Sequence, residues 1–444
     1  MKSLFEKYNQ QAPRYTSYPA MPYWKNNMDE RDWFSCLEKG LALDPRADMY
    51  IHVPFCAKLC WYCGCNRVIT KNQSEGDRYL DGLLKELEIY TETFPHLKIR
   101  SLHLGGGTPN FLTPKQMRRM LDPFTSFLSD DFEGAIEVDP RTCTIEQFQL
   151  LADFGFTRIS FGVQDFDPEV QKAINRIQDF EMVEKVCAEA RAAGFKHVNF
   201  DLIWGLPKQS PQTIARTVGL SDKLAPEQIS FYSYAHLPSR FKHQNLIKAS
   251  DILEGEDKRK LYDTGKELFE KAGYSEIGMD HYAKKGSVLD LASRQRKLTR
   301  NFMGYTDEKA QNLIGLGASA ISSNSYGYVQ NEKDLEPYLK LASSKKIPLN
   351  KGHLKLGEDD LREKIIQDLM CNLKIDVDEL SLLQDFEQLK KSFEDFERDG
   401  LLVLEKSRYL ATPLGRTFIR SIASSLDPYY QASKDKNEKF SKTV

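Results

Sequence analysis

Between residues 49 and 232, short apolar runs alternate with longer amphipathic stretches, and this alternation limits the possible folds more than any other feature of the chain. The apolar runs predict strands over Met49–Val53, Ile99–Leu104, Gly134–Val138, Arg158–Gly162, His197–Ile203 and Gln228–Tyr232. The stretches between them predict helices over Asp77–Thr91, Pro114–Phe127, Thr144–Phe154, Phe180–Ala193 and Gln212–Leu224. Strands joined by crossover helices pair in parallel. We therefore predict an α/β fold built on a barrel or partial barrel of six or more such units.

A change of pattern near residue 335 predicts a second domain. The chain there becomes rich in Lys and Glu, with helical patterns over Asp334–Ser343, Glu358–Leu373 and Asp385–Asp399. A hairpin of Leu401–Glu405 with Tyr409–Ala411 follows, and then a helix from about Pro413, which is typical of a winged-helix-like domain. We expect an N-terminal segment over residues 1–45, a barrel over 46–335 and a small, mainly helical domain over 336–444. On composition, the charged tail Gln431–Val444 is predicted to be disordered.

The charge balance argues against a nucleic-acid partner. The 62 Lys and Arg residues nearly equal the 64 Asp and Glu residues, and the formal net charge is -2. Nucleic-acid-binding proteins usually have a basic excess or a basic stripe. No stretch has the composition of a membrane span, and the first residues lack the apolar core of a signal peptide. We expect a cytoplasmic protein with no membrane span.

Four of the eight cysteines lie within ten consecutive positions, as Cys56, Cys60, Cys63 and Cys65. Soft thiolates select zinc, copper(I) or an iron–sulfur cluster. Structural zinc sites usually draw two ligand pairs from distant segments, and no second pair with ligand spacing occurs here. Three thiolates on one loop with C-x3-C-x2-C spacing can instead hold three irons of a cubane and leave the fourth open. We predict that Cys56, Cys60 and Cys63 bind a [4Fe-4S] cluster, with zinc as the alternative.

The remaining cysteines are scattered, as small buried residues usually are, and we expect them to be structural. These are Cys36, Cys143, Cys187 and Cys371.

Two glycine-containing segments follow predicted strands or apolar runs. In Leu104–Pro109, three consecutive glycines expose backbone groups to which a ligand could come close, although the alternative is a flexible turn. Leu316–Ile321 could supply backbone contacts to an adenine, and close packing against a helix is its alternative. The C-x3-C-x2-C spacing is the signature of the radical S-adenosylmethionine superfamily, whose members bind the methionine amino group one strand after the cysteine loop.

Longer motifs make the resemblance more specific. The chain resembles the family of oxygen-independent coproporphyrinogen III dehydrogenases almost from end to end. The motifs that carry the resemblance are Lys7–Asn9, Pro13–Pro19, Cys63–Cys65, Glu137–Arg141, Phe161–Asp165, Asn175–Arg176, Asp201–Pro207, Tyr234–Pro238, Gly278–His281, Arg300–Thr306 and Phe440–Lys442. The last of these counts against disorder of the whole tail.

The resemblance implies a fold, a reaction and its cofactors. The fold would be a partial (β/α) radical-SAM barrel, with residues 46–335 as the catalytic part. The reaction would convert two propionates of coproporphyrinogen III into vinyl groups, giving protoporphyrinogen IX in haem biosynthesis. A 5′-deoxyadenosyl radical, generated at the cluster from S-adenosylmethionine, would start each decarboxylation. A reduced flavodoxin- or ferredoxin-type protein would donate electrons, and the chain would be a monomer.

The resemblance also assigns residues to two molecules of S-adenosylmethionine. Those around the first are Tyr50, Gly106, Glu137 and Ile321. Those around the second are Tyr62, Gly107, Thr108, Gln164, Arg176, Asp201 and Ala235. The expected catalytic residues are Tyr50, His52, Cys65 and Glu137.

Several of these assignments have a structural alternative. Glu137 could cap the turn that follows its strand, and Arg176 could form a surface salt bridge instead of binding a carboxylate. His52 shares a strand face with Tyr50 and could be hydrogen-bonded inside the barrel. Cys65 does not fit a site with three ligands, although the resemblance implies that activity needs it.

The N-terminal segment is expected to cover the substrate. Pro13–Pro19 is stiff and partly apolar, and Arg14 is a candidate partner for a propionate. The alternative is that this segment packs on the barrel exterior and contributes only stability. Two other functions stay open, a haem chaperone of the same family and a radical methyltransferase or haem-degrading relative. Cys65 and Pro13–Pro19 favour the dehydrogenase over the chaperone, because such chaperones generally lack both features.

Overall fold

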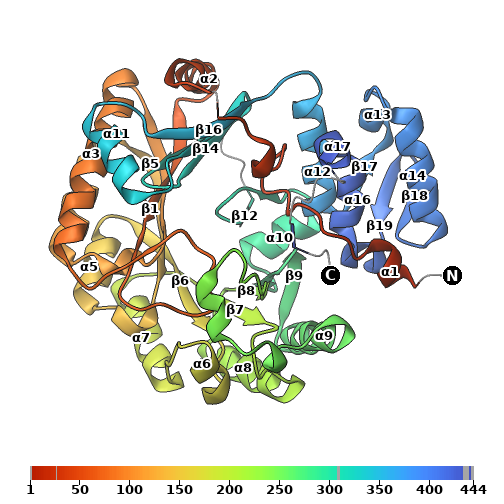
Figure 1. The fold of residues 1–444 in the computed structure, drawn as a ribbon, viewed down its shortest axis with the longest axis horizontal. Helices are drawn as coiled ribbons and strands as arrows, with labels where there is room; N and C mark the ends of the chain where they lie inside the picture. Colours follow the sequence, from red (N-terminus) through yellow and green to blue (C-terminus); the bar gives the residue numbers. More distant parts are fainter. Residues whose placement is uncertain (1–2, 27, 308–310, 434–439, 442–444) are drawn as a thin grey trace.

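The computed structural model describes residues 3–26, 28–307, 311–433 and 440–441, and its centre is one curved, twelve-stranded sheet (Figure 1). The strands lie in the order β16-β15-β14-β13-β1-β4-β5-β6-β7-β8-β10-β9. Their bounds are β1 Arg46–Val53, β4 Lys98–Gly106, β5 Leu128–Val138, β6 Phe156–Gln164, β7 His197–Trp204, β8 Gln228–Ser233, β9 Tyr274–Gly278, β10 His281–Lys284, β13 Asn312–Leu316, β14 Ile321–Asn324, β15 Gly327–Asn331 and β16 Leu349–Leu354.

The sheet is parallel in its centre and antiparallel at both edges. Neighbouring strands from β13 to β8 pair in parallel. The edge strands on both sides pair in antiparallel fashion. Strands β16 and β9 end the order and do not pair with each other, so the barrel is partial. This arrangement confirms the predicted α/β fold, and all six predicted strands are present.

Helices follow the central strands and cover the outer face of the sheet (Figure 1). They are α3 Ser74–Thr93, α4 Pro114–Leu121, α5 Ile145–Asp153, α6 Pro168–Ala173, α7 Phe180–Ala193, α8 Pro211–Leu224 and α9 Gly255–Lys271. Thr113 and Ser210 cap α4 and α8, and each is followed by a proline in the first turn. The prediction of one helix over Pro114–Phe127 is wrong. The α-helix ends at Leu121 and a 3-10 helix follows, because Pro123 has no N–H for a helical hydrogen bond.

The C-terminal domain is mainly helical, as predicted, and it contains a three-stranded sheet in which one strand, β17, adds to the predicted hairpin. Its elements are α12 Asp359–Asn372, β17 Lys374–Asp376, α13 Val377–Leu380, α14 Phe386–Arg398, β18 Leu402–Glu405, β19 Arg408–Ala411, α15 Pro413–Thr417, α16 Ile419–Ser425 and α17 Pro428–Ser433. β18 and β19 form the expected hairpin. Helix α11 (Leu335–Ser343) packs on α3, and β16 belongs to the large sheet. The barrel's contacts thus extend past residue 335, and we propose a domain boundary after Leu354.

The N-terminal segment packs against both domains. After α1 (Leu4–Tyr8), an extended stretch places Tyr15 and Tyr18 in a hydrophobic core shared with the C-terminal domain. Helix α2 (Glu30–Leu43) then packs on the core of the barrel through Trp33. The segment is therefore part of the folded body.

The predicted disorder of the tail is wrong where the structure describes it. Residues 431–433 belong to α17. The Phe440 ring lies 6.1 Å from that of Tyr23, and the Ser441 carbonyl accepts hydrogen bonds from Ala12 N and Arg420 Nη2. These contacts hold the end of the tail against the N-terminal segment. The prediction for residues 434–439 and 442–444 lies outside the described residues.

None of the helices in the described ranges combines the length and the apolar composition that crossing a membrane requires.

Candidate active site

The loop with the clustered cysteines leaves the C-terminal end of β1. The short strands β2 (Phe55–Cys56) and β3 (Val68–Ile69) pair in parallel and close the loop at its base. Its tip is held by the segment after α6, because Asn175 Nδ2 donates to Leu59 O at 2.9 Å and Trp61 N donates to Ile174 O at 3.0 Å. The structure thus places Cys56, Cys60 and Cys63 on one anchored loop above the sheet.

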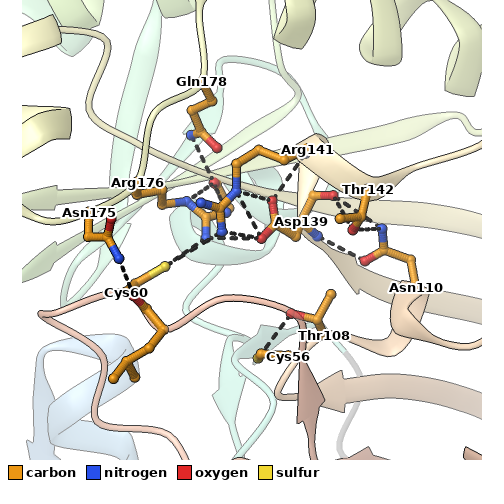
Figure 2. A network of polar contacts seen from close by, with 12 residues as sticks. Cys56, Cys60, Thr108, Asn110, Asp139, Arg141, Thr142, Asn175, Arg176 and Gln178 are labelled. Carbon is orange, nitrogen blue, oxygen red and sulfur yellow. Dashed lines mark hydrogen bonds and ion pairs between the residues drawn. The ribbon is translucent and has the colours of Figure 1, made fainter. Parts of the chain in front are cut away.

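Two arginines lie beside the Cys60 thiol, and both bind the carboxylate of Asp139 (Figure 2). Arg141 Nη2 lies 3.6 Å and Arg176 Nη1 lies 3.4 Å from Cys60 Sγ. Asp139 accepts from both, at 2.6 Å from Arg141 Nη2 and 3.3 Å from Arg176 Nη1. Burial opposes ionisation of Asp139, but the charge of Arg176 and the hydrogen bond from Arg141 outweigh it and lower the pKa of Asp139. Two guanidinium groups thus lie within reach of the Cys60 sulfur, and one carboxylate holds both of them in place.

The other thiols differ in their surroundings. Burial raises the pKa of Cys56 to about 11, although the Thr108 hydroxyl lies 3.2 Å from its sulfur (Figure 2). Hydrogen bonding to Cys65 and the charge of Arg67 lower the pKa of Cys63 to about 6. The same pairing with Cys63 raises the pKa of the Cys65 thiol. Cys65 thus lies exposed on the loop, and its backbone N–H donates to Sγ of the candidate cluster ligand Cys63 at 3.5 Å.

The donor set fits a cysteine-ligated cluster. Within the described ranges, no three His, Cys, Asp or Glu side chains are arranged to hold a single metal ion. A cubane is larger than an ion and takes its ligands from more widely spaced thiolates, while neighbouring donors to the sulfurs stabilise the bound form. Cys60 has two guanidinium donors and Cys56 has a hydroxyl beside it. The zinc alternative gains no support from this geometry.

The residues proposed for the first S-adenosylmethionine meet at the ends of β1, β4 and β5. Glu137 Oε2 accepts from Gly106 N at 3.4 Å, and His103 Nε2 lies 3.0 Å from Glu137 Oε1. A Cβ atom on Gly105 would come within 2.9 Å of the Tyr50 ring and 3.0 Å of the Glu137 carboxyl. Only glycine therefore allows these two side chains to stand this close to the strand.

Ile321 joins the same group through β13. Gly315 is the register partner of Tyr50, and a Cβ on Gly315 would come within 2.4 Å of Ile321 O. Ile321, the first residue of β14, therefore lies across β13 from Tyr50, at the same level of the sheet. The segment Leu316–Ile321 is a turn between two strands, and it packs closely on helix α3, since Ala318 N donates to Tyr79 Oη at 3.0 Å and a Cβ on Gly317 would collide with the same hydroxyl. The alternative of close helix packing therefore has direct support, and the adenine contact of Ile321 stays a proposal.

Glu137 does not cap the turn that follows its strand. Asp139 does so, because its carboxylate accepts from Arg141 N at 3.1 Å. Enclosure within the barrel opposes ionisation of Glu137, but hydrogen bonding to His103 outweighs it and lowers the pKa of Glu137. An ionised acceptor thus faces the space between the strand ends.

His52 has partners for both ring nitrogens. Its Nδ1 lies 3.2 Å from Tyr50 Oη, and its Nε2 lies 2.9 Å from Asn66 O. Burial lowers the pKa of His52 and keeps the ring neutral. The structural alternative for His52 therefore has direct support, and its catalytic role stays a proposal.

The residues proposed for the second cofactor molecule lie around Arg176 and the loop after β8. Arg176 is 7% exposed and donates to Gly162 O at 2.6 Å, so the surface salt bridge is ruled out. A Cβ on Gly162 would lie 2.9 Å from Arg176 Nη2 and 3.0 Å from Gln164 Nε2, which places these two side chains together. Gln244 Nε2 joins the two backbone positions, donating to Tyr62 O at 3.0 Å and to Ala235 O at 3.3 Å.

Asp201 lies deeper in the barrel. Ser160 Oγ donates to its Oδ2 at 2.9 Å and Asn199 Nδ2 donates to its Oδ1 at 3.0 Å. Burial and the charge of Glu137 raise the pKa of Asp201 to about 6. The remaining members of the set, Gly107 and Thr108, follow the end of β4, where Gly107 N donates to Val53 O at 2.8 Å.

A cavity of about 740 Å³ occupies the concave side of the sheet. Glu137, Asp201, Tyr232, His281 and Tyr305 are among the residues that line it. Arg14 stands behind this wall, paired with Asp280, the residue before His281. Its carbonyl accepts from Arg300 Nη1 at 3.1 Å.

Sequence reasoning assigned no role to several residues of the site. Three of them could have been found, namely His103, Asp139 and Arg141. His103 lies two positions after Ser101, so both side chains point to the same face of the strand. Asp139 and Arg141 belong to the motif Glu137–Arg141. Gln244 gave no sequence signal, and neither did Glu86 of α3, which accepts from Gly317 N at 2.9 Å in the turn before Ile321.

Comparisons with known proteins agree with this geometry. The model of the Radical SAM superfamily matches residues 50–220, and that of the HemN C-terminal domain matches residues 357–418. The oxygen-independent coproporphyrinogen III oxidase of Salmonella typhimurium is 35% identical and covers 100% of this chain and 98% of its own length. That of Helicobacter pylori is 37% identical, with 99% and 98% covered. The structure of coproporphyrinogen III oxidase (HemN) from Escherichia coli, a radical SAM enzyme, has a TM-score of 0.88 and 34% identity, and the match covers 95% of this chain and 100% of that one.

Proposed function

The chain belongs to the family of oxygen-independent coproporphyrinogen III oxidases, and we propose that it converts two propionates of coproporphyrinogen III into vinyl groups, giving protoporphyrinogen IX for haem. The observation that carries this proposal is the anchored loop of three thiols beside Glu137 and the glycine segment, on a chain similar to these enzymes over its full length. The protein is then an oxidoreductase.

The cysteine loop would hold a [4Fe-4S] cluster through Cys56, Cys60 and Cys63. When bound and reduced, the cluster and S-adenosylmethionine supply an organic radical that removes a hydrogen atom from a propionate β-carbon. Arg141 and Arg176 offset the negative charge of the thiolates, so they help to retain the cluster. Glu137 would accept hydrogen bonds from the methionine amino group, since its pKa is lowered and it faces the strand ends.

A second S-adenosylmethionine would lie between the loop and the end of β6. Arg176 and Gln164 offer donors beside Gly162, while Tyr62 and Ala235 are tied together by Gln244. Asp201 would accept from a hydroxyl or an amino group of this molecule. Cofactor binding and substrate positioning are the protein's share of the chemistry.

The cavity of about 740 Å³ would hold the porphyrinogen. Its wall includes neutral donors such as Asn301, Tyr232 and Tyr305, which could bind the carboxylates of the substrate, and a substrate that fills the cavity would exclude water from the radical. Residues 1–45 would cover this site, with Arg14 acting on a propionate directly or through its pairing with Asp280. We retain Cys65 as a catalytic residue, because it is exposed beside the cluster ligands.

The proposed function is tested by anaerobic assay. The reconstituted protein should contain about four irons per chain and should form protoporphyrinogen IX from coproporphyrinogen III with dithionite as reductant. Ala at Cys56, Cys60 or Cys63 should remove most of the iron, whereas Cys65→Ala should retain the iron and lose activity. Haem binding or haem breakdown without vinyl formation would refute the proposal in favour of the chaperone or the haem-degrading relative.

Three further assignments are part of the proposal. The electron donor would be a reduced flavodoxin- or ferredoxin-type protein and the chain a monomer. The free state of all eight cysteines supports a reducing, cytoplasmic setting.

A further inference from the structure

A second cavity, of about 420 Å³, lies on the outer side of the cysteine loop. Its walls come from the loop itself and from the first turns of α4 and α5. Ala57 and Lys58, which stand between two candidate cluster ligands, line it together with Lys71, Thr108 and Arg141. We call this the loop groove.

Two side chains that line the loop groove also contact candidate cluster ligands. Thr108 lies 3.2 Å from Cys56 Sγ, and Arg141 lies 3.6 Å from Cys60 Sγ (Figure 2). Both side chains form part of the groove wall. Only these side chains and the cysteine ligands would therefore separate a molecule bound in the groove from the cluster.

The charge of the loop groove is positive. Lys58 and Lys71 are exposed, and no ion pair joins either ammonium group to a carboxylate of the described residues. The one carboxylate in the wall, Asp139, is already paired with Arg141 and Arg176. The caps of α4 and α5, Thr113 and Thr144, also lie in the wall, so two helix N-termini add to the positive potential.

An apolar contact lies beside these cations. Ile69 is 44% exposed and is the register partner of Cys56 in the small β2–β3 ladder. Lys71 follows two positions later, at the rim of the groove. A basic rim beside an exposed aliphatic side chain suits a transient interface with an acidic protein.

We propose that the loop groove and Ile69 form the docking surface for an acidic one-electron carrier protein that reduces the cluster. The carrier loses one electron and the cluster gains it. This inference rests on the proposed function, which supplies the cluster. It selects one face of the barrel for the electron donor, on the grounds of charge complementarity and contact with two ligand side chains.

The test compares charge reversals at the groove with reversals elsewhere. Lys58→Glu/Lys71→Glu alters the groove, whereas Lys98→Glu/Lys196→Glu alters exposed lysines at the N-terminal ends of β4 and β7, at the opposite end of the strands. Both double variants change the net charge equally. The probe is reduced flavodoxin, and the readouts are its affinity by calorimetry and the rate of cluster reduction by stopped flow. Iron content and reduction by dithionite are measured for all variants.

The groove variant should bind flavodoxin about tenfold or more weakly at low salt, and cluster reduction by flavodoxin should slow in proportion. Its iron content and its reduction by dithionite should match the wild type. The control variant should behave as the wild type. Because Lys58 lies in the cluster loop, a second variant places both changes outside that loop. It is Lys71→Glu/Lys115→Glu, and Lys115 is exposed in the first turn of α4, next to the lining residue Pro114.

Equal affinity in the groove and control variants, or no binding of flavodoxin by the wild type at low salt, overturns the docking proposal. Failure of the wild type to form vinyl groups with dithionite would instead overturn the proposed function. The two failures are therefore separate, since dithionite needs no docking surface.

Discussion

Glu86 offers a direct test of how the site near Ile321 is held. It lies in α3 and is 0% exposed. Its carboxylate accepts three hydrogen bonds, from Gly317 N at 2.9 Å, Asn331 Nδ2 at 2.6 Å and Tyr338 Oη at 2.7 Å. Gly317 belongs to the turn that leads to Ile321. We therefore expect Glu86 to position this turn for the cofactor.

The cost of replacing Glu86 can be estimated from these bonds. Glu86→Ala would leave three buried donors without an acceptor, at about 1–3 kcal/mol each. Relaxation around Tyr338 and entry of water reduce the sum, so we expect a loss of about 3–5 kcal/mol in the free energy of unfolding. Glu86→Gln keeps the volume but places an NH2 group, with two hydrogens and no acceptor, where the protonated acid has one hydrogen and an oxygen that still accepts. We expect about 1–3 kcal/mol for this change.

The effect should depend on pH. Burial raises the pKa of Glu86 from 4.5 to about 7, so the folded state prefers the protonated form. Between these two values the unfolded state loses its proton first, and wild-type stability falls as pH rises. The shift corresponds to about 3 kcal/mol, lost fully only above pH 7. Gln cannot titrate, so the deficit of Glu86→Gln should be largest near pH 5 and should shrink toward pH 8.

The assay is anaerobic urea unfolding followed by circular dichroism at both pH values. Glu88→Gln is the matched control, because Glu88 is exposed on the same helix. S-adenosylmethionine binding should weaken in Glu86→Gln while its iron content stays normal. Equal unfolding midpoints for wild type and Glu86→Gln at both pH values would refute this reasoning.

Three other changes probe the site. Glu137→Gln should keep its iron but bind S-adenosylmethionine about tenfold more weakly, since one charge-assisted acceptor is lost; normal binding in equilibrium dialysis would contradict this role. Gln244→Ala should raise the KM for S-adenosylmethionine without loss of iron, because it releases two backbone carbonyls; unchanged steady-state kinetics would exclude it as a positioning residue. Arg14→Ala should raise the KM for coproporphyrinogen III more than it lowers kcat, and a wild-type KM would remove Arg14 from substrate binding.

The central strands were predictable because buried apolar residues alternate along them with polar residues, as in His197–Ile203, where Asn199 and Asp201 line the cavity. The edge strands β13 to β16 were not predicted. They are short and hold many buried amides and hydroxyls, among them Asn312, Ser322, Asn324 and Asn331. These side chains form hydrogen bonds with backbone groups of turns, helices and neighbouring strands. Asn324 Nδ2, for example, donates to Cys36 O at 2.7 Å. Such bonding depends on the tertiary fold and leaves no apolar pattern in the sequence.

The candidate site likewise has a part that the sequence predicted and a part that it did not. The cysteines and the glycine segment are local in sequence, so their spacing alone indicated cluster chemistry. The groups that tune them come from far away, since Arg141 and Arg176 are 81 and 116 residues from Cys60. Gln244 reaches Tyr62 across 182 residues. No spacing rule applies to such pairs, and only the parallel sheet, which gathers strand ends at one edge, brings them together.

The N-terminal segment shows how burial changes the interpretation of a sequence motif. Pro13–Pro19 suits a cover, but Tyr15 and Tyr18 belong to the core of the C-terminal domain. Arg420 Nε donates to Pro13 O at 3.0 Å, and its Nη2 donates to Ser441 O at 2.9 Å, so one side chain ties the segment to the tail. A cover held in this way is fixed, and removing residues 1–20 would cost stability as well as substrate binding. Arg14 contacts Asp280 outside that core, so substitution of Arg14 separates covering from stability where truncation does not.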